Sequence, residues 1–384
     1  FGMNKKNKKL VIVNQDVGYL FVDLANAALE HYDEVVLVSG SIVELGSRLD
    51  ERVKTRSMVR YRRKSVLSRF TSWMLGFLQV AWLLRSRFRA HEAVVASNPP
   101  LNTLLPLLVR NKMGLYVLDM YPEALYKTGM VSSKSLVVRV WARFNAMAYR
   151  RFSGIWALTP SMKTAIEQEY QVEVGFAPAW ASALDADLDR SFLDRVGLTD
   201  AWIVLYSGNL GREHEVEALL DCAAKLSDRE DLVFVIAGEG WKKKMLEERV
   251  ATERLTNVRL LPKLPGAEFS ALIGHARIGV VTQSLRTADV CIPSKTFNLL
   301  ASGLPILGIG KPDSDFGALI DGTGSGQVFR PDKVDEMSRF VSSCWENETV
   351  WQNYRQRART AAESFTRSNA EQLVDQFAME DSHR

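Results

Sequence analysis

A glycine-rich turn followed by an arginine carries the clearest chemistry in this sequence. In the segment Val204–Arg212, VLYSGNLGR, an apolar strand ends at Tyr206, the turn contains two glycines, and a helix is expected from about Glu215. Glycine allows a tight turn and a close approach of the backbone, and N–H groups at the start of a helix favour an anion. The guanidinium of Arg212 is suited to a diphosphate. The same pattern also fits an ordinary strand–helix turn without a ligand.

Two further turns of this kind follow in the same half of the chain. Gly238-Glu239-Gly240 comes directly after an apolar run, and a helix that starts near Pro293 carries Lys295 in its first turn. A lysine at the start of a helix can neutralise a phosphate, although alone it equally fits a surface lysine on a capped helix. Because ligands of open α/β sheets bind outside the carboxyl ends of the strands, the three turns together predict a phosphate-bearing ligand.

Short apolar segments that alternate with amphipathic ones must position these turns. The expected strands are the runs Leu10–Asn14, Glu34–Ser39, Ala93–Ser97, Leu115–Leu118, Gly154–Leu158, Ile203–Tyr206, Val233–Ala237, Val258–Leu261, Ile278–Val281 and Ile306–Ile309. Strands that are apolar along their whole length lie in parallel sheets with helices on both faces. The sequence therefore predicts an α/β fold built from strand–helix repeats, and its length predicts two domains.

The composition is that of a soluble globular protein, with 47% hydrophobic and 24% charged residues, and excludes a disordered, collagen-like or disulfide-rich chain. The three cysteines lie far apart, so neither a disulfide framework nor a CxxC metal site is expected, and a reducing cytoplasm fits best. The net charge of +4 hides an asymmetry, because residues 1–184 contain 25 Lys and Arg against 14 Asp and Glu. The basic first half is expected to meet an anionic partner or surface.

This positive charge is concentrated between Arg48 and Arg89, where twelve lysines and arginines stand against two acidic residues. The apolar centre, Phe70–Leu84, is interleaved with aromatic residues and is shorter than the about 20 residues that a membrane-spanning helix needs. A basic patch beside an aromatic, apolar helix is typical of a segment that lies on an anionic membrane. We therefore expect a basic, amphipathic, membrane-facing helix at about 52–89. A core helix with solvated arginines is the alternative, and nucleic acid is disfavoured because no nucleic-acid-binding module is recognisable.

Taken together, the motifs resemble family 4 of the retaining glycosyltransferases. The series YSGNLGR, FVIAGEG, NVRLLPKLP and PSKTFNLLASGLPIL, followed by glycines at 322, 324 and 326, is similar to the donor half of these enzymes, which have the GT-B fold. In the first half, Ser97-Asn98-Pro99-Pro100 and Asp119-Met120-Tyr121-Pro122-Glu123 resemble the subset that builds bacterial surface polysaccharides of the colanic-acid and O-antigen type. The resemblance covers nearly the whole chain and is densest from Leu205 to Val328.

The resemblance implies two Rossmann-like domains whose parallel sheets face a cleft. Residues 3–180 would form the acceptor-binding domain and residues 185–350 the nucleotide-sugar domain, with the boundary in Ala177–Asp200, where the sequence has no strong period. The C-terminal helix, residues 351–384, would cross back and pack on the first domain.

For the donor site, the resemblance implies that Arg212 and Lys295 hold the diphosphate and stabilise the leaving group. Glu239 and the stretch Leu261–Leu264, which contains Lys263, match positions around the nucleoside. The full set of expected donor-binding residues is Gly18, Gly208, Asn209, Gly211, His214, Glu239, Lys263, Asp289, Ser294 and Asn298.

Three residues of the first half are also expected to take part. Gly18 matches a position in the first loop of the acceptor domain that approaches the donor phosphate. Asp119 and Glu123 follow a strand and are expected to bind the acceptor or to act as a base, with capping of the loop as the alternative.

The sequence departs from the family at one pair of positions. Many members carry two glutamates eight residues apart that contact the donor, and here these positions are Val290 and Asn298. Asn298 can still hydrogen-bond a ribose hydroxyl, and Asp289 is a candidate to replace the missing sugar contact. His214 is expected near the phosphate, with a role at the helix start as the alternative. The departure leaves the donor sugar open and is compatible with a weakened or inactive enzyme.

The expected reaction is transfer of a sugar, with retained anomeric configuration, from a UDP-sugar to a polyprenyl-diphosphate-linked or other glycan acceptor. No cofactor is expected, and no metal, because no Asp-x-Asp sequence follows a strand and GT-B enzymes usually stabilise the leaving group with side chains and helix dipoles. The expected location is the cytoplasm, at the inner face of the cytoplasmic membrane. Two alternatives stay open, namely a nucleotide-sugar epimerase on the same fold and a catalytically weak partner in a polysaccharide assembly complex.

Overall fold

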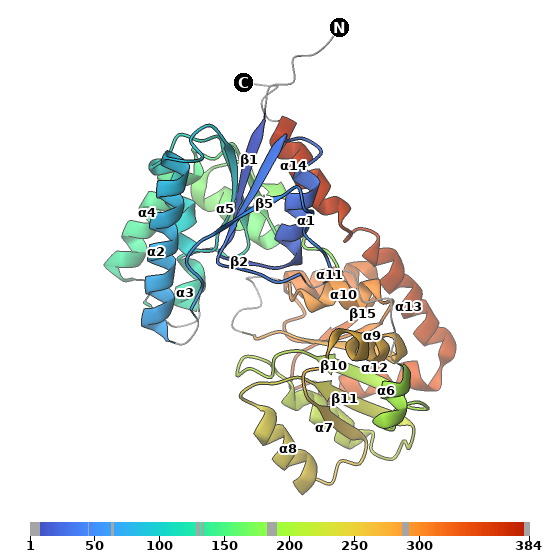
Figure 1. Cartoon of the computed structure of the whole chain (residues 1–384). Coiled ribbons are helices and arrows are strands. Elements are labelled where there is room, and N and C mark those ends of the chain that lie inside the picture. Colours follow the sequence, from blue (N-terminus) through green and yellow to red (C-terminus); the bar gives the residue numbers. More distant parts are fainter. Residues whose placement is uncertain are drawn as a thin grey trace. The chain divides into compact units, whose positions relative to one another are not determined.

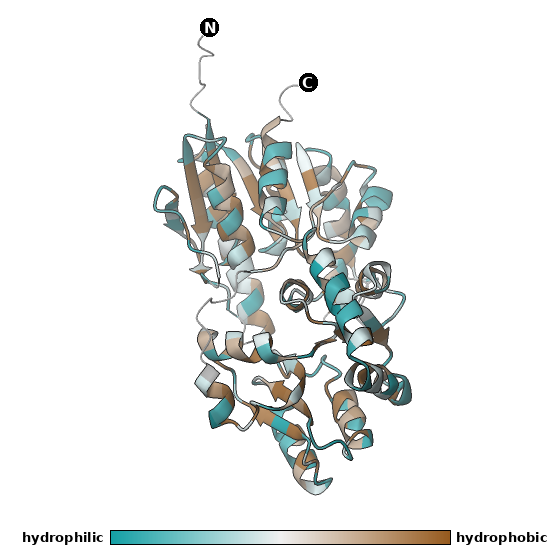
Figure 2. Ribbon diagram, turned by 90° about the vertical axis from the view of Figure 1, so that its right-hand side faces the viewer, coloured by the Kyte–Doolittle hydropathy of each residue, from teal (hydrophilic) through white to brown (hydrophobic). Residues whose placement is uncertain are grey.

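The computed structural model describes residues 8–44, 46–62, 65–127, 131–132, 134–182, 190–285 and 292–379. By its internal contacts the chain divides into two compact units, Phe1–Ser182 with Arg367–Arg384, and Ala183–Thr366 (Figure 1). Each unit has its own parallel sheet, covered by helices, and its own hydrophobic core. Figure 2 shows that the strands are largely hydrophobic, whereas the helices carry both hydrophobic and hydrophilic residues.

The sheet of the first unit has seven parallel strands in the order β5-β3-β1-β6-β7-β8-β9. Their bounds are β1 (Lys9–Val13), β3 (Glu34–Ser39), β5 (Lys54–Ser57), β6 (Glu92–Ala96), β7 (Met113–Val117), β8 (Gly154–Ala157) and β9 (Gly175–Phe176). A further parallel pair is formed by β2 (Asp16–Val17) and β4 (Ser41–Ile42). The strand order reverses between β1 and β6, so the segments that follow these two strands run in opposite directions across the sheet.

Alternate side chains of the strands pack on opposite faces of this sheet. In β1, Leu10 and Ile12 pack in one cluster with α1 (Tyr19–Ala28) and α14 (Ser368–Met379), whereas Val11 and Val13 pack in another. The second face is covered by α2 (Val66–Arg85), the 3₁₀ helix η1 (Pro100–Leu107), α4 (Leu136–Tyr149) and α5 (Pro160–Tyr170), and α3 (Glu123–Lys127) follows β7. Burial of both faces explains why the strands are apolar along their whole length.

The sequence predicted one basic, amphipathic helix over about residues 52–89, and this prediction is wrong. Lys54–Ser57 form β5, an exposed edge strand paired with β3, and α2 begins only after Ser65. The side chains of Ser65 and Ser68 each accept a hydrogen bond from the other's backbone N–H, which closes the helix N-terminus. The charged residues of β5 lack the apolar period that would bury a helix. In the part of the chain that the structure describes, no helix is both long and apolar enough to cross a bilayer.

The sheet of the second unit has six parallel strands in the order β12-β11-β10-β13-β14-β15. The strands are β10 (Trp202–Ser207), β11 (Leu232–Ala237), β12 (Val258–Leu261), β13 (Ile278–Thr282), β14 (Ile306–Ile309) and β15 (Gly326–Phe329). The helices are α6 (Arg190–Arg195), α7 (Glu217–Lys225), α8 (Lys243–Thr252), α9 (Gly266–His275), α10 (Lys295–Ala301), α11 (Asp315–Thr323), α12 (Val334–Glu346) and α13 (Glu348–Ala362). Val204 and Tyr206 of β10 pack towards α7, α8 and α12, whereas Ile203 and Leu205 pack towards α9, α10 and α11.

The end of the chain is divided between the two units. α13 packs on α10 in the second unit, where Ala358 and Ala361 belong to the core, whereas α14 packs on α1 in the first unit. The predicted return of the C-terminus to the first domain is therefore confirmed for α14. The preceding residues, 351–366, which the prediction included in the returning helix, belong to the second unit.

Candidate active site

Several predicted donor-binding residues of the second unit follow β10 and β13, the strands at which the order of its sheet reverses. The chain runs from β10 outward to β11 and β12, and then returns to β13 on the other side of β10. Such a reversal is where ligands of open α/β sheets bind. The turn after β10 contains Gly208, Asn209, Gly211 and Arg212, and α10, which begins at Lys295, comes after β13.

The glycine turns after β10 and β11 pack backbone to backbone. A Cβ atom on Gly238 would lie 1.9 Å from the carbonyl oxygen of Gly208, and one on Gly240 would lie 2.5 Å from the carbonyl carbon of Leu210. The N–H of Leu210 also donates to the carbonyl oxygen of Glu239 at 2.9 Å. Only glycine allows this approach, so these residues are needed for the turns themselves, with or without a ligand.

Lys295 places a buried positive charge beside the first of these turns. Its Nζ lies 4.2 Å from the centre of the Tyr206 ring, and a Cβ atom on Gly208 would lie 2.5 Å from it. This Nζ is buried and has no hydrogen-bond partner among the residues that the structure describes. Burial lowers the pKa of Lys295 to about 8. A buried cation without a counter-charge costs free energy that an anionic ligand would recover.

Arg212 stacks on Trp241, with its Cζ 4.5 Å from the centre of the ring. Both side chains are exposed, and Trp241 directly follows Gly240. The pair therefore connects the turn after β10 with the turn after β11. Because stacking uses the face of the guanidinium, its in-plane N–H groups stay available to a diphosphate.

His214 lies close to Lys295 and Lys242. Its Nδ1 is 3.1 Å from the Oγ1 of Thr282, and its carbonyl oxygen accepts a hydrogen bond from the Nζ of Lys242 at 2.6 Å. Burial, followed by the charges of Lys295 and Lys242, lowers the pKa of His214 below its ordinary value. The ring is therefore neutral at neutral pH, and it can contact a ligand as a hydrogen-bonding group and not as a second cation.

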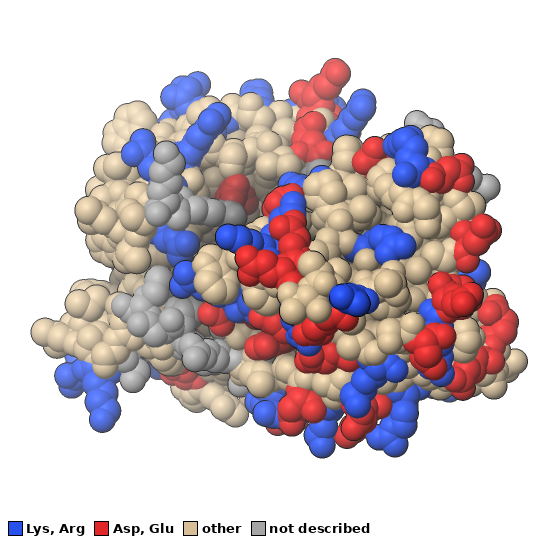
Figure 3. All heavy atoms as spheres, turned by 90° about the horizontal axis from the view of Figure 1, so that it is seen from below, with Lys and Arg blue, Asp and Glu red and all other residues tan. Residues whose placement is uncertain are grey.

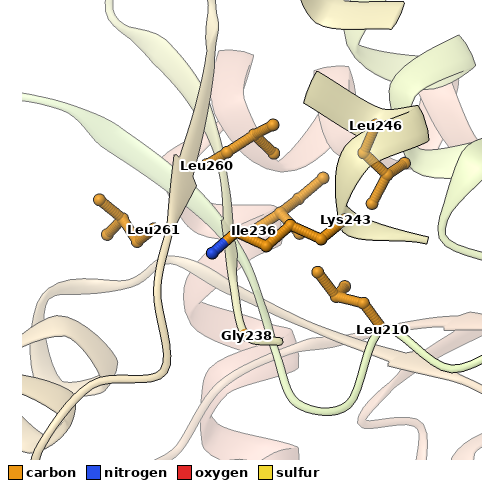
Figure 4. Close-up of a pocket in the computed structure, with 7 residues that line it drawn as sticks. All are labelled: Leu210, Ile236, Gly238, Lys243, Leu246, Leu260 and Leu261. Atoms are coloured by element: carbon orange, nitrogen blue, oxygen red, sulfur yellow. The ribbon is translucent and has the colours of Figure 1, made fainter. Parts of the chain in front are cut away.

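A small recess lies beside the turn after β11 (Figure 4). Its lining residues are Leu210, Ile236, Gly238, Lys243, Leu246, Leu260 and Leu261. The walls are mostly aliphatic, and the side chain of Lys243 extends into the view from α8. The Nζ of Lys243 pairs with the carboxylate of Glu239 at 2.6 Å, so Glu239 lies at this recess too. Glu239 and Leu261 are both predicted to surround the nucleoside.

The remaining predicted donor residues are distributed over three segments. Ser294 precedes α10 without capping it through its side chain, and Asn298 lies on α10 one turn after Lys295. Lys263 is exposed and follows β12. Asp289, with Val290, lies outside the described residues.

The three predicted residues of the first half belong to the first unit. Gly18 precedes α1 and is exposed, with no described atom within 4 Å of the position that a Cβ would take. Asp119 follows β7, where its N–H donates to the Oγ of Ser97 at 3.1 Å, and burial raises the pKa of its carboxyl group. Glu123 begins α3. A carboxylate with a raised pKa is a stronger base, as the predicted role of Asp119 requires.

The positive charge of the donor site is local. Acidic and basic side chains are interspersed over the face shown in Figure 3, so no field of one sign covers it. Within the described ranges, no three His, Cys, Asp or Glu side chains lie close enough to hold a metal ion. Lys295, Arg212 and Lys242 place cations at the turn after β10, and the ammonium of Lys242 is paired with the carboxylate of Glu217 at 2.7 Å.

The family of the second unit follows from a direct match. Residues 192–364 match the family model described as glycosyl transferases group 1. This part of the chain is a group 1 glycosyltransferase domain. The predicted family resemblance is confirmed by this match, and the names of the two relatives below agree with the predicted class of transferase enzyme.

Two curated bacterial proteins are similar to this chain. One is WcaI of Escherichia coli (strain K12), named as a colanic acid biosynthesis glycosyl transferase, which is 29% identical over 211 residues, or 52% of this chain and 51% of that protein. The other is WbjE of Pseudomonas aeruginosa, named as a glycosyltransferase, which is 22% identical over 298 residues, or 75% of this chain and 74% of that protein. The match therefore spans about half the length of the first relative.

Among solved structures, HepE of Anabaena, in complex with UDP and glucose, has a TM-score of 0.68 at 13% sequence identity. The match covers 96% of this chain and 98% of that chain. The predicted GT-B fold, with two Rossmann-like halves, is confirmed by this likeness.

Sequence reasoning does not identify two residues that contact the predicted basic pair. Tyr206, under the Nζ of Lys295, has the pattern of a buried strand residue, and nothing in the sequence links it to α10. Trp241, under Arg212, directly follows the GEG turn, and an exposed aromatic residue at that place was an available signal.

Proposed function

We propose that the protein is a retaining glycosyltransferase that moves a sugar from a UDP-sugar to a lipid-linked acceptor in bacterial polysaccharide biosynthesis. The observation that carries the proposal is the buried Nζ of Lys295, which has no partner in the described part of the chain and lies beside the turn after β10. The UDP in the HepE complex supports the choice of nucleotide. The name of WcaI supports the class of pathway.

The proposed mechanism depends on charge at the leaving group. When a sugar departs from a nucleoside diphosphate, negative charge grows on the terminal phosphate oxygen. Lys295 and Arg212 would stabilise that charge, and the desolvated ammonium of Lys295 interacts with it more strongly than an ammonium in water would. In this proposal side chains do this work without a metal ion, and no covalent nucleophile takes part.

The acceptor side of the proposal rests on the first unit. α2 exposes large apolar side chains, namely Val66, Leu67, Phe70, Leu75, Leu78 and Trp82, of which Leu67 is 73% and Trp82 63% exposed. Arg62 precedes the helix and Arg85 lies in its last turn. Exposed aliphatic and aromatic residues with basic flanks favour the interface of an anionic membrane. We propose that α2 docks the enzyme on the inner face of the cytoplasmic membrane, where a lipid-linked acceptor is accessible.

Calorimetric titration with UDP, GDP, dTDP and ADP tests the donor. We expect UDP to bind most tightly, and Arg212→Ala and Lys295→Ala each to weaken it about ten-fold or more, because each removes a charge-assisted contact. Lys244→Ala is the matched control, since Lys244 is an exposed lysine of the same unit. Absence of binding by every nucleotide would refute the proposal.

Product analysis separates the transferase from its two alternatives. A transferase releases UDP only when both donor and acceptor are present. An epimerase converts the donor without any acceptor, and a catalytically weak partner binds UDP without turnover.

Flotation with vesicles tests the membrane claim. The wild-type protein should float with anionic vesicles and not with zwitterionic ones. Neutralising Arg62, Arg63 and Lys64 together should reduce the fraction of protein bound to anionic vesicles. Arg63 and Lys64 lie outside the described residues. The control neutralises Lys333 and Arg339, which are exposed in the second unit. A wild-type protein that does not float with anionic vesicles contradicts the claim.

A further inference from the structure

Four aromatic rings form a connected series in the first unit. Tyr61, before α2, stacks on Trp73 of α2 with 5.8 Å between ring centres. Trp73 meets Tyr121, after β7, edge to face at 6.0 Å, and Tyr121 stacks on Trp141 of α4 at 6.3 Å. The series therefore brings α2 and α4 to the segment that follows β7 and contains Asp119 and Glu123.

Three hydrogen-bond donors at this cluster have no acceptor in the part of the chain that the structure describes. The indole Nε1 atoms of Trp73 and Trp141 and the Nε of Arg69 are buried, and none has an acceptor among the residues that the structure describes. Trp73 is only 8% exposed, and Arg69 lies one turn before it on the same face of α2. Buried indole N–H groups usually find a partner, because an unpaired buried donor costs free energy.

A ligand group with several acceptor oxygens would satisfy these three hydrogen-bond donors. All three groups are donors that cannot accept a hydrogen bond, so a ligand must supply acceptor oxygens. Arg69 also carries a permanent positive charge, which favours an anionic group. A phosphate or diphosphate provides several strong acceptors together with that charge.

The surroundings of the cluster are apolar and exposed. α2 and α4 both pack on η1, and α4 exposes Leu136, Val137, Val140, Phe144 and Met147 in addition to the side chains that α2 exposes. Leu136 and Val137 are 71% and 69% exposed. Two helices that meet at the aromatic series therefore each carry an exposed apolar face, which suits a hydrocarbon chain attached to the anionic group.

We infer that Trp73, Trp141 and Arg69 donate hydrogen bonds to the diphosphate of the lipid-linked acceptor, whose hydrocarbon chain lies against the exposed apolar residues of α2 and α4. This inference rests on the proposed function and names the acceptor as an isoprenoid-type lipid diphosphate. Asp119 lies two residues before Tyr121, close enough for its carboxylate to raise the pKa of that tyrosine, so the aromatic series lies next to the acid predicted to act as a base.

Binding of farnesyl diphosphate, a short and soluble lipid diphosphate, tests the site. Calorimetry on the full chain compares it with farnesol, which lacks the phosphates, and with inorganic diphosphate, which lacks the chain. The variants are Trp73→Phe, Trp141→Phe and both together, because phenylalanine keeps an apolar ring and removes the N–H. Trp82→Phe is the control, since Trp82 is an exposed indole of α2 outside the aromatic series.

We expect the wild-type protein to bind farnesyl diphosphate more tightly than either comparison ligand. Each of the two variants should weaken this binding about ten-fold, the double variant should weaken it further, and Trp82→Phe should change it less than two-fold. The melting temperature of the ligand-free double variant should fall because ring volume is lost, whatever the role of the N–H groups. Farnesol, which has the chain but not the phosphates, therefore separates loss of the diphosphate contact from a structural defect, because only a structural defect would weaken both ligands equally.

Equal binding of farnesyl diphosphate by the wild type and the double variant would overturn the inference, as would equal losses with farnesol. The donor titration keeps this result separate from the proposed function. If UDP binds and farnesyl diphosphate does not, the acceptor site is refuted and the donor site stands. If UDP does not bind, the proposed function itself fails.

Discussion

Replacing Lys295 with methionine should stabilise the protein and at the same time weaken its nucleotide binding. Burial lowers the pKa of Lys295 from an ordinary value of 10.5 to about 8. One pKa unit corresponds to about 1.4 kcal/mol, so keeping this ammonium charged in the fold costs about 3 kcal/mol. Its contact with the ring of Tyr206 returns up to about 2 kcal/mol. Methionine has a similar length and no charge, so Lys295→Met should raise the free energy of unfolding at pH 7 by about 1–3 kcal/mol.

The stability that Lys295→Met gains over the wild-type protein should depend on pH. The folded pKa of Lys295 lies below the unfolded one, so between pH 8 and about 10.5 the unfolded state binds more protons than the folded state. The stability of the wild-type protein therefore rises over this range relative to that of the variant. The cost is fully present below pH 8 and disappears by about pH 10.5.

Lys295→Met should weaken UDP binding although it stabilises the fold. Loss of a charge-assisted hydrogen bond costs about 1.5–3 kcal/mol, so Lys295→Met should weaken UDP about 10- to 100-fold at pH 7. Above pH 8 the ligand-free wild-type protein must take up a proton to bind UDP. Its affinity should therefore fall by up to about ten-fold per pH unit, whereas the affinity of the variant should stay level.

Denaturant unfolding at pH 7 and pH 10, together with calorimetric UDP titrations at pH 7 and pH 9.5, measures both effects. Lys244→Met is the control, because Lys244 is 86% exposed in its side chain and should change neither quantity. A variant that is less stable than the wild type at pH 7 would refute a desolvated, uncompensated ammonium. A variant that binds UDP as tightly as the wild type would refute the contact between Lys295 and the diphosphate.

Two further predictions concern the stability of each unit. Gly238→Ala should lower the free energy of unfolding, measured by denaturant titration, by more than about 3 kcal/mol, because its Cβ would lie 1.9 Å from a backbone oxygen of Gly208. Gly274→Ala, in open space on α9, is the control and should raise the free energy of unfolding by about 0.5–1 kcal/mol. Equal effects would contradict the backbone packing of the two turns. Asp23→Ala should lower it by about 1–3 kcal/mol, since the buried indole N–H of Trp180 donates to Asp23 at 2.9 Å and would lose its acceptor. The double variant Asp23→Ala, Trp180→Phe should lose less free energy of unfolding than the two single variants together. An additive loss would contradict an energetic contribution of this hydrogen bond.

The fold class could be predicted from the sequence because it depends on local period. Strands such as Val233–Ala237 are apolar at every position, which only a sheet covered on both faces can bury. The glycine turns after β10 and β11 were also predictable, because the required residue types stand next to one another in the chain. The extent of the basic helix was predicted wrongly, since charge composition does not distinguish the edge strand β5 from the start of α2.

Only the tertiary structure decided how these segments act together. Lys295 lies far along the chain from Tyr206 and Gly208, and the return of the chain from β12 to β13, on the other side of β10, brings α10 to this turn. The burial of its Nζ, the lack of a partner for it among the described residues and its lowered pKa are consequences of that packing, because burial depends on the whole fold. That the indole N–H groups of Trp73 and Trp141 are buried, with no acceptor in the described ranges, likewise becomes visible only when α2 and α4 are in place. Residue type and local spacing therefore determined what chemistry this chain carries, and packing over long separations decided which groups are desolvated and left for a ligand.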